Sequence, residues 1–521
     1  MCLSANSITN IISIHCVCQH FFQKFFVNRQ IFSLFVVTPP LCLLICYTYY
    51  TVIDRDEYII YTEVGDDMKI DFNNAKAGQS LFGWGTSACW WSQYCTGDAA
   101  DEIARLLYSD DGLGLNIYRY NIGGGTDDNN CRISNPWRKT ESMLLYDREN
   151  EEFSWDYSRD KNAVDMMKKC LSYGKVDTLI LFCNSPHYSQ CSTGQASGSL
   201  LYHTCNIPAS KYKAFADYVL DVAEHFLAEG LPVKYISPIN EPQWKWGGAS
   251  VWQEGCHYET EEMVAVFRIF AEKIIKRGLP LKLYGPESGE YLGLTEEYLD
   301  ALYSDKTIIK VLDVFAVHSY HCDNEPSVRR EFRKKIRNKY PDIRMDMSEW
   351  CELPNMSPVD DFTGALITAR IIGQDLTVAG MESWTSWVAV NNFAVKDGKD
   401  YSDGVITADF DFSAWAVAMR WYGFAHFSRY VPVGSTVLNI GMEPTDDNNL
   451  TNAFAFLTPD SKTVLVAVNE GENTEITLNG NFSHMKKIIS DGERLLKEDY
   501  DGDFKQSIIL NKNSIITVIL S

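Results

Sequence analysis

Two glutamates stand where a carboxylate has little structural purpose. Glu241 lies in "KYISPINEPQWKW" (234–246), between an asparagine and a proline at the end of an apolar run. Glu349 lies near the end of a second apolar run, "RMDMSEW" (344–350). Two carboxyl groups that face one bond can act as a general acid and as a nucleophile or general base, which is the chemistry of glycosidic bond cleavage. We therefore interpret the two glutamates as candidate catalytic residues.

The neighbours of Glu241 favour this interpretation over a simple surface turn. By itself "NEP" is a weak signal, because Pro242 could merely end a strand. Asn240, however, can hydrogen-bond a sugar hydroxyl beside the bond that is cut. Trp244 and Trp246 add flat rings on which sugar C–H groups can stack.

Both glutamates belong to a series of apolar runs, each followed by an amphipathic helical stretch. The eight runs are 81–87, 115–125, 178–186, 234–242, 281–288, 314–321, 344–350 and 381–390. The clearest helix is predicted over 212–228, where apolar residues recur at helical spacing before Gly230 and Pro232. Strand and helix in eightfold alternation predict an α/β fold, a (β/α)8 barrel over residues 81–425. Its strands' carboxyl ends form the active-site rim, where both glutamates would lie.

A smaller β domain is predicted after the barrel. Residues 426–521 hold short β-rich runs separated by Asn, Asp and Gly clusters, which is typical of an antiparallel β-sandwich. The segment 54–80 contains "EYIIYTEV" and "MKIDF". These two runs precede the barrel in the sequence and would add strands to the sandwich, which would then be built from both ends of the chain.

The charge of the chain excludes polyanionic partners. The sequence has 47 basic and 69 acidic residues, a net charge of −22. Phosphate binding needs clustered Lys and Arg, so we expect no nucleic-acid partner. The basic run from Arg329 to Lys339 is interpreted as the solvated face of an amphipathic helix. The sequence makes no prediction about the oligomeric state.

Residues 1–53 are interpreted as a leader. The stretch 31–53 contains 23 residues without a charge and follows Lys24 and Arg29. This pattern predicts export through a signal peptide or signal anchor, and therefore a secreted or cell-surface protein. A transmembrane helix is the alternative, so membrane or lipid anchorage stays open.

The cysteines give no sign of a metal module. Five of the 15 lie in the leader, and the rest show no paired metal-ligand spacing. We expect no metal and no cofactor. An exported protein could pair Cys191 with Cys205, whereas free buried cysteines are the alternative.

Taken together, the motifs from Leu81 to the C-terminus resemble glycoside hydrolase family 30. They are "INEP", "SEW", "RYNIGGG", "VHSY" in the sixth run, "SWTSW" in the eighth, and "FSRYVPVGS" between the two domains. This family includes glucocerebrosidases, β-1,6-glucanases, glucuronoxylanases and β-1,6-galactanases. The resemblance implies a barrel with a fused β-sandwich, a retaining two-step mechanism and no metal.

The resemblance also implies residue roles. Glu241 would be the general acid/base, with Asn240 beside it, and Glu349 the nucleophile. Arg119 would keep the Glu349 carboxylate ionised. The remaining substrate contacts would be Tyr320 and Trp387, which line the subsite where the bond is cut, and His318, for which a buried barrel histidine is the alternative.

Within the family, "GTSACWW" (85–91), "RYNIGGG" and "WQEGCHY" (252–258) look most like the β-1,6-galactanase branch. The substrate would then be the side chains of arabinogalactan. Ala88 and Cys89 depart from the expected pattern. Ligand-facing rings are expected for Trp84, Trp90 and Trp244, with core packing as the alternative.

Other functions remain in competition. Within the family, the chain could be a β-1,6-glucanase, a xylanase or a glucosylceramidase-like member. A carbohydrate-binding barrel without catalysis would keep the aromatic residues and usually lose a catalytic carboxylate. An anchored structural or adhesion protein would explain the leader and the sandwich, but not the two glutamates.

Overall fold

A computed structural model describes residues 68–128, 131–201, 204–249, 251–353, 355–446 and 450–521. The leader and the strand expected in "EYIIYTEV" lie outside these ranges. Within them, no helix combines the length and the apolar character needed to cross a bilayer.

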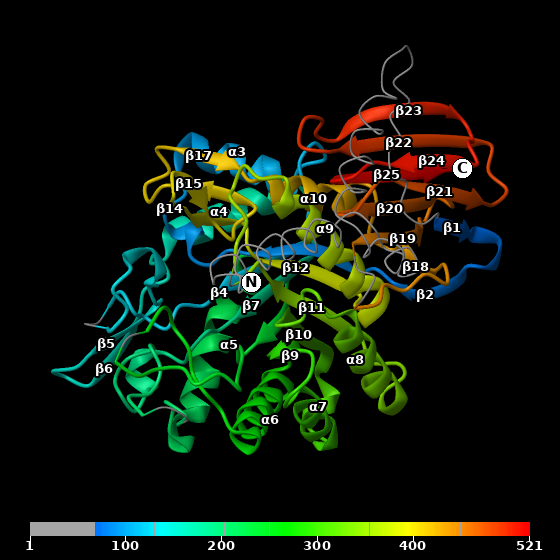
Figure 1. Cartoon of the computed structure of the whole chain (residues 1–521). Helices are drawn as coiled ribbons and strands as arrows, with labels where there is room; N and C mark the ends of the chain where they lie inside the picture. The colour runs from blue at the N-terminus through cyan, green and yellow to red at the C-terminus, as the bar shows by residue number, and fades with distance from the viewer. Residues whose placement is uncertain (1–67, 129–130, 202–203, 250, 354, 447–449) are drawn as a thin grey trace, which may run out of the picture. The chain divides into compact units, whose positions relative to one another are not determined.

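Eight parallel strands close into a barrel (Figure 1). Their order is β3 (Gly83–Ser87), β4 (Ile117–Asn121), β7 (Thr178–Phe182), β8 (Val233–Ser237), β9 (Lys282–Glu290), β10 (Leu312–Tyr320), β11 (Met345–Trp350) and β12 (Ser383–Val388). Each predicted run supplies one of these strands, so the predicted barrel is confirmed. Its interior below the rim is filled by a small cluster of buried side chains: Ile117, Ile180, Tyr235, Tyr284, Val314 and Ala316.

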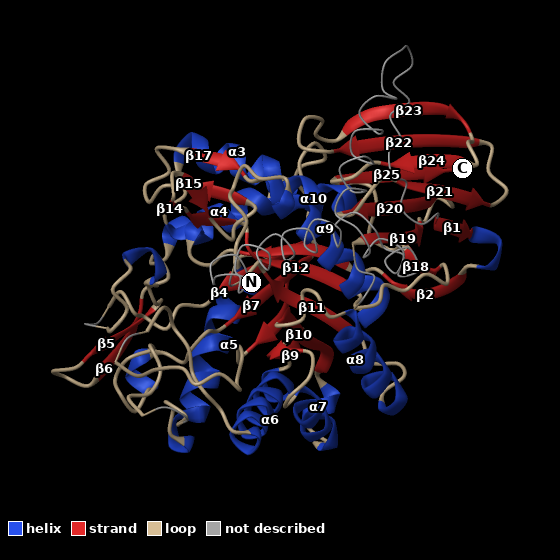
Figure 2. Ribbon diagram, viewed as in Figure 1, coloured by secondary structure: helices blue, strands red, loops and turns tan. Residues whose placement is uncertain are grey.

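A helix follows each barrel strand (Figure 2). These helices are α3 (Gly97–Tyr108), α4 (Lys161–Leu171), α5 (Tyr212–Ala228), α6 (Thr260–Arg277), α7 (Thr295–Ser304), α8 (Pro326–Lys339), α9 (Thr363–Gln374) and α10 (Met419–Ser428). Helix α5 has the predicted bounds because its apolar stripe ends there and Gly230 adopts the left-handed conformation, with φ of 80°.

The basic helix α8 differs from its prediction at one residue. Arg329 is buried rather than solvated, and it donates to Asp375 Oδ1 (2.8 Å) and to the Cys322 carbonyl (2.5 Å). Asp375 lies in the short π-helical turn Asp375–Ala379 that continues α9. A charged residue in this run therefore holds two barrel helices together, which the charge pattern alone did not predict.

The sandwich consists of two facing sheets. The larger contains, in order, β2 (Lys76–Ser80), β18 (Thr436–Asn439), β19 (Thr451–Leu457), β20 (Thr463–Asn469), β25 (Ser514–Leu520), β22 (His484–Ser490) and β23 (Lys497–Asp503). The smaller contains β1 (Met68–Asp71), β21 (Thr474–Asn479) and β24 (Ser507–Leu510). Strand β1 comes from "MKIDF" and pairs with β21 in parallel, so the sandwich is not wholly antiparallel.

Helices α9 and α10 join the barrel to the sandwich. Gly373 in α9 lets the ring of Phe454 on β19 approach the helix backbone. In α10, His426 is fully buried and bonds Thr517 Oγ1 and Ser490 Oγ, both at 2.8 Å. Burial lowers the pKa of His426 to about 3, so the side chain that makes these two hydrogen bonds is a neutral imidazole.

Further strands extend the loops at the barrel's carboxyl end. The hairpin β5 (Leu144–Asp147) and β6 (Glu152–Trp155) follows β4. After β12 come β13 (Val390–Asn392), β16 (Ile406–Ala408) and β17 (Trp415–Val417), with the hairpin β14 (Ala394–Lys396) and β15 (Lys399–Tyr401).

All ten cysteines in the described ranges are free thiols. Cys191 and Cys205 are therefore not joined. Both are free thiols, and Cys191 is buried whereas Cys205 is only partly buried.

Candidate active site

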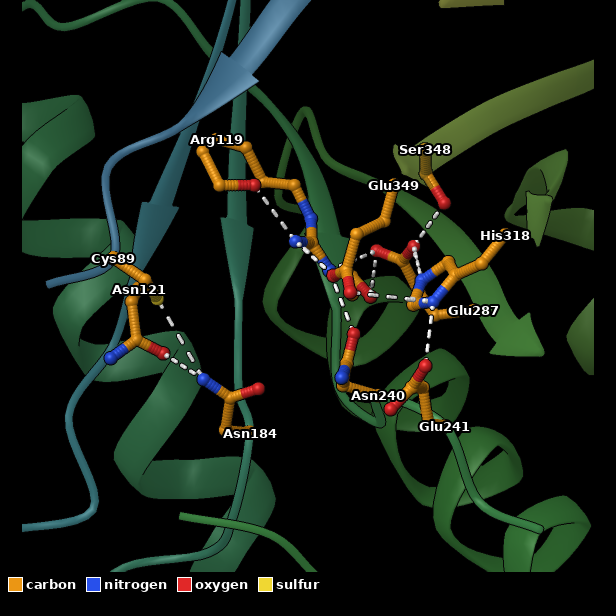
Figure 3. Close-up of polar contacts among 12 residues, drawn as sticks. Cys89, Arg119, Asn121, Asn184, Asn240, Glu241, Glu287, His318, Ser348 and Glu349 are labelled. Carbon is orange, nitrogen blue, oxygen red and sulfur yellow. Dashed lines mark hydrogen bonds and ion pairs between the residues drawn. The ribbon is translucent and has the colours of Figure 1, made fainter. Parts of the chain in front are cut away.

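The two candidate catalytic glutamates meet at the carboxyl end of the barrel (Figure 3). Glu349 lies in β11, and Glu241 lies just beyond β8. One carboxylate oxygen of each lies within 4.8 Å of the other. Glu241 has a left-handed backbone, with φ of 47°, and its N–H donates to the Glu287 carbonyl (2.9 Å). Such a conformation is uncommon outside glycine and is found at functional sites where the surrounding structure enforces it.

His318 on β10 connects three carboxylates. Its Nδ1 lies 3.0 Å from Glu241 Oε1 and 3.6 Å from Glu349 Oε1, and its Nε2 lies 3.3 Å from Glu287 Oε2. Burial alone would lower the pKa of His318, but the three carboxylates outweigh it and raise the pKa to about 10. The ring is therefore a buried imidazolium between the candidate catalytic residues.

Arg119 on β4 is fully buried beside Glu349. It donates to Glu349 Oε2 (3.0 Å), Asn240 Oδ1 (2.8 Å), Glu287 Oε1 (3.2 Å) and Ser87 Oγ (2.9 Å). Burial raises the pKa of Glu349 to about 7, although His318 and Arg119 oppose the rise. Arg119 therefore lowers the pKa of Glu349, as expected, but does not cancel the increase caused by burial.

Glu287 is a third carboxylate at the site, and the motif analysis missed it. It lies in β9, is fully buried and has φ of 59°. Besides Arg119 and His318, the hydroxyls of Ser237 (2.9 Å) and Ser348 donate to it. Burial would raise its pKa, but Arg119, His318 and Ser348 lower it to about 2, so Glu287 stays ionised. The fifth predicted run ends in "GPES", so the strand-end argument could have found it.

Aromatic residues flank the carboxylates. The Tyr320 hydroxyl lies 3.1 Å from Glu349 Oε1 and donates to it. The Trp387 ring packs edge-on against Trp90 at 5.4 Å, and the Arg119 guanidinium lies 5.9 Å from the Trp387 ring centroid. Tyr320 therefore contacts Glu349, Trp387 lies beside Arg119, and Trp90, which is 1% exposed, packs behind Trp387.

Trp244 lies beside Glu241. A Cβ at Gly289 would stand 2.4 Å from Trp244 Nε1 and 2.9 Å from Glu241 Oε1, so glycine is what lets both side chains approach the end of β9. The ring of Trp244 also meets His321 at 5.6 Å. Trp244 therefore lies near the acid/base candidate, and its ligand-facing role stays a prediction.

Trp84 differs from its expectation. Its side chain is 1% exposed, its Nε1 donates to the Val431 carbonyl (2.9 Å), and its ring packs against Phe424 and Phe427. Trp84 is therefore a core residue between the barrel and α10, which agrees with the alternative of core packing.

The site's donor atoms suit proton transfer better than metal binding. Within the described ranges, Glu241, His318 and Glu349 form a group that could hold an ion, since their ligand atoms lie within 4.8 Å of one another. However, both ring nitrogens of His318 already bond carboxylates, and Arg119 already neutralises Glu349. A metal ion there would have to displace these bonds and the proton of His318.

A barrel with two close carboxylates at the carboxyl end of its strands defines the general class, a glycoside hydrolase. The profile of the family described as O-Glycosyl hydrolase family 30 matches residues 67–401. The chain belongs to glycoside hydrolase family 30.

Relatives with different substrates resemble the chain. An endo-beta-1,6-galactanase of Hypocrea rufa is 25% identical over 416 residues, which cover 76% of this chain and 80% of that protein. A glucuronoxylanase of Bacillus subtilis is 23% identical over 299 residues, covering 56% and 61% of the two chains. The crystal structure of a conserved exported protein from Bacteroides fragilis has a TM-score of 0.75 at 21% identity, covering 87% of this chain and 100% of that one.

Proposed function

We propose that the protein is a retaining β-glycoside hydrolase that cleaves β-1,6-galactan, as found in arabinogalactan side chains. One observation carries the mechanism: carboxylate oxygens of Glu241 and Glu349 lie within 4.8 Å of each other. Retaining enzymes place the two groups about 5 to 5.5 Å apart, whereas inverting enzymes need about 6.5 to 9.5 Å to admit a water.

The reaction would proceed in two displacements. In the first, Glu349 attacks the anomeric carbon, the glycosidic C–O bond breaks, and Glu241 donates its proton to the leaving oxygen. In the second, Glu241 takes a proton from water, the water oxygen attacks the anomeric carbon, and the ester bond to Glu349 breaks. Configuration at the anomeric carbon is inverted twice and so retained.

The buried cations support both steps. With Glu241 protonated, the charges of Glu287, Glu349, Arg119 and His318 cancel. After the first displacement Glu349 is a neutral ester and Glu241 is ionised, so the charges cancel again. His318 Nδ1 faces both glutamates, at 3.0 and 3.6 Å, and can therefore follow the negative charge from one to the other. A constant net charge avoids the cost of an uncompensated buried ion.

The galactan assignment rests on similarity. The relative from Hypocrea rufa carries that activity and is matched over most of its length. The competing family substrates are β-1,6-glucan, glucuronoxylan and glucosylceramide. The non-catalytic alternative is disfavoured because Glu241 and Glu349 are both present and close together.

A substrate panel tests the proposal. The full chain is offered β-1,6-galactan, β-1,6-glucan, glucuronoxylan and an aryl β-glucoside, with Glu349→Ala as the blank. We expect release from galactan alone. Removal of the nucleophile should abolish turnover, by at least about 10⁴-fold, without loss of the folded circular dichroism spectrum. Full activity in the variant would contradict the role of Glu349, and release from another substrate would discard the galactan assignment.

We also propose export of the protein, which the uncharged stretch 31–53 supports. Cell fractionation with N-terminal sequencing is the test. We expect the protein outside the cytoplasm. Retention in the cytoplasm with an intact first residue would contradict it.

A further inference from the structure

Two cysteines that are distant in the sequence meet between the loops that follow β7 and β8. Cys205 lies near the end of the loop after β7, and Cys256 lies near the end of the loop after β8. Cys256 is fully buried, and Cys205 is partly buried against the same apolar core. None of the catalytic roles proposed above uses either thiol.

The backbone places the two cysteines side by side. Their sequence neighbours, Asn206 and Gly255, both bond the same segment of the loop after β7, residues 192–197. The Asn206 carbonyl accepts from the Ser192 N–H (2.6 Å), and the Gly255 N–H donates to the Ala196 carbonyl (3.2 Å). The two cysteines are therefore held at neighbouring positions along one stretch of backbone.

The two thiols also contact each other. A hydrogen bond with Cys256, together with burial, raises the pKa of Cys205 well above its ordinary value. Thiols at hydrogen-bond distance differ from a disulfide by a short movement of the two sulfurs, so the backbone needs little change. The structure therefore shows this pair in its dithiol form.

We propose that Cys205 and Cys256 form a disulfide that joins the loops after β7 and β8. The reaction is an exchange with a small-molecule disulfide such as oxidised glutathione. The Cys205 thiolate attacks that disulfide and releases one glutathione, and the Cys256 thiolate then attacks the mixed disulfide and releases the second. Two cysteine thiols and one glutathione disulfide give one protein disulfide and two glutathione thiols, which take up the two protons.

The bond forms while the chain folds. Only a thiolate attacks a disulfide, and the raised pKa of Cys205 keeps its thiol protonated once the pair is buried. The oxidant must therefore be present during folding. The disulfide goes beyond the proposed glycosidase activity, and in the cell it rests on the proposed export, since compartments outside the cytoplasm supply such oxidants.

The disulfide fixes the loop that begins at the acid/base candidate. Pro242 follows Glu241, and its carbonyl accepts from the Tyr258 N–H (3.0 Å). Tyr258 lies two residues beyond Cys256, so the bond anchors the returning end of this loop to the neighbouring loop. The cross-link also closes a long loop of the unfolded chain, which reduces the entropy of unfolding and raises the Tm.

Peptide mapping tests the pairing. The full chain is produced in a bacterial host with an oxidising cytoplasm, so that folding meets an oxidant whether or not the chain is exported. It is then alkylated without reduction and digested with trypsin. Trypsin places Cys205 in peptide 176–211 and Cys256 in peptide 246–268, and we expect these two peptides to be linked. A Cys191–Cys205 bond would lie within one peptide, and an unlinked peptide 246–268 would overturn the proposal.

Substitutions identify the two sulfurs. Cys205→Ser and Cys256→Ala should each lose the linked peptides, and the second variant keeps the test valid if the first does not fold. The matched control is Cys191→Ser, which changes a buried cysteine of the same loop and should keep the link. Linked peptides that persist in Cys205→Ser would overturn the proposal.

Thermal unfolding measures the effect of the bond. Dithiothreitol should lower the Tm of the wild type and of Cys191→Ser by at least about 3 °C, and that of Cys205→Ser by less than about 1 °C. An equal effect of the reductant on wild type and Cys205→Ser would show a merely structural role of the thiol and overturn the proposal. Neither measurement needs turnover, so failure to cleave any panel substrate would overturn only the proposed function.

Discussion

Glu241 and Glu349 are chemically alike, and their different surroundings should separate their kinetic roles. An acid is needed most when the leaving group is a poor one. Glu241→Ala should therefore lower kcat on unactivated glycosides about 10²- to 10⁴-fold and spare aryl glycosides with acidic leaving groups. The measurement is kcat against the pKa of the leaving group. A uniform loss along that series would argue against the acid role of Glu241.

His318 should set the acid limb of the pH profile. Glu349 must be ionised to attack, and its pKa is raised to about 7, so kcat/KM should rise as the pH increases through 7. Removing the imidazolium deprives Glu349 of a stabilising cation and raises its pKa further. His318→Gln should therefore move the acid limb to higher pH. The matched control, His225→Gln on the outer helix α5, should leave the limb in place, and an unmoved limb in His318→Gln would contradict the assignment.

The sequence predicts some site residues and not others for a physical reason. Glu241, Glu349 and Arg119 stand in short motifs on or just beyond different strands, and the barrel brings them together. Trp84 could not be distinguished from a ligand-facing tryptophan, because its environment is supplied by α10, far away in sequence. Glu287 was overlooked although its motif was visible, since its role depends on contacts from four other strands.

At the scale of elements, the local sequence pattern predicts the positions of the strands and helices, because these follow from the spacing of apolar residues. All eight barrel strands and the bounds of α5 follow from apolar runs and from the glycine that ends the helix. The sequence pattern of one element does not specify which other element it pairs with. The parallel pairing of β1 with β21, and the burial of Arg329 against Asp375, depend on residues that are distant in the chain.

The contact between α9 and β19 gives a prediction for one glycine. A Cβ at Gly373 would stand 2.1 Å from the Phe454 ring. Gly373→Ala should therefore lower the free energy of unfolding by about 1 to 3 kcal/mol through overpacking. Gly364→Ala in the same helix is the matched control, since its nearest neighbours stand at 3.6 Å, and alanine there should be neutral or stabilise by up to about 1 kcal/mol. Denaturant unfolding measures both, and equal stabilities would contradict the packing argument.

On the scale of the whole molecule, barrel and sandwich share one core. The largest cluster of buried apolar residues extends from the barrel strands through α9 and α10 to β19, β20 and β25. Nearly every residue of α9 is buried, which a barrel helix with a free outer face would not show. The sandwich is therefore the cover of two barrel helices rather than an independent appendage.

A shared core predicts cooperative unfolding. The full chain should lose catalytic activity and its circular dichroism signal in a single thermal transition, because unfolding the sandwich exposes the apolar faces of α9 and α10. Deleting residues 436–521 should likewise give an insoluble or inactive barrel, since those faces then meet water. Two separate transitions, or a soluble and active barrel after the deletion, would show that the sandwich is dispensable. In the expected case, substitutions at Phe454 and His426 would lower activity through stability alone and leave KM unchanged, although both residues lie outside the active site.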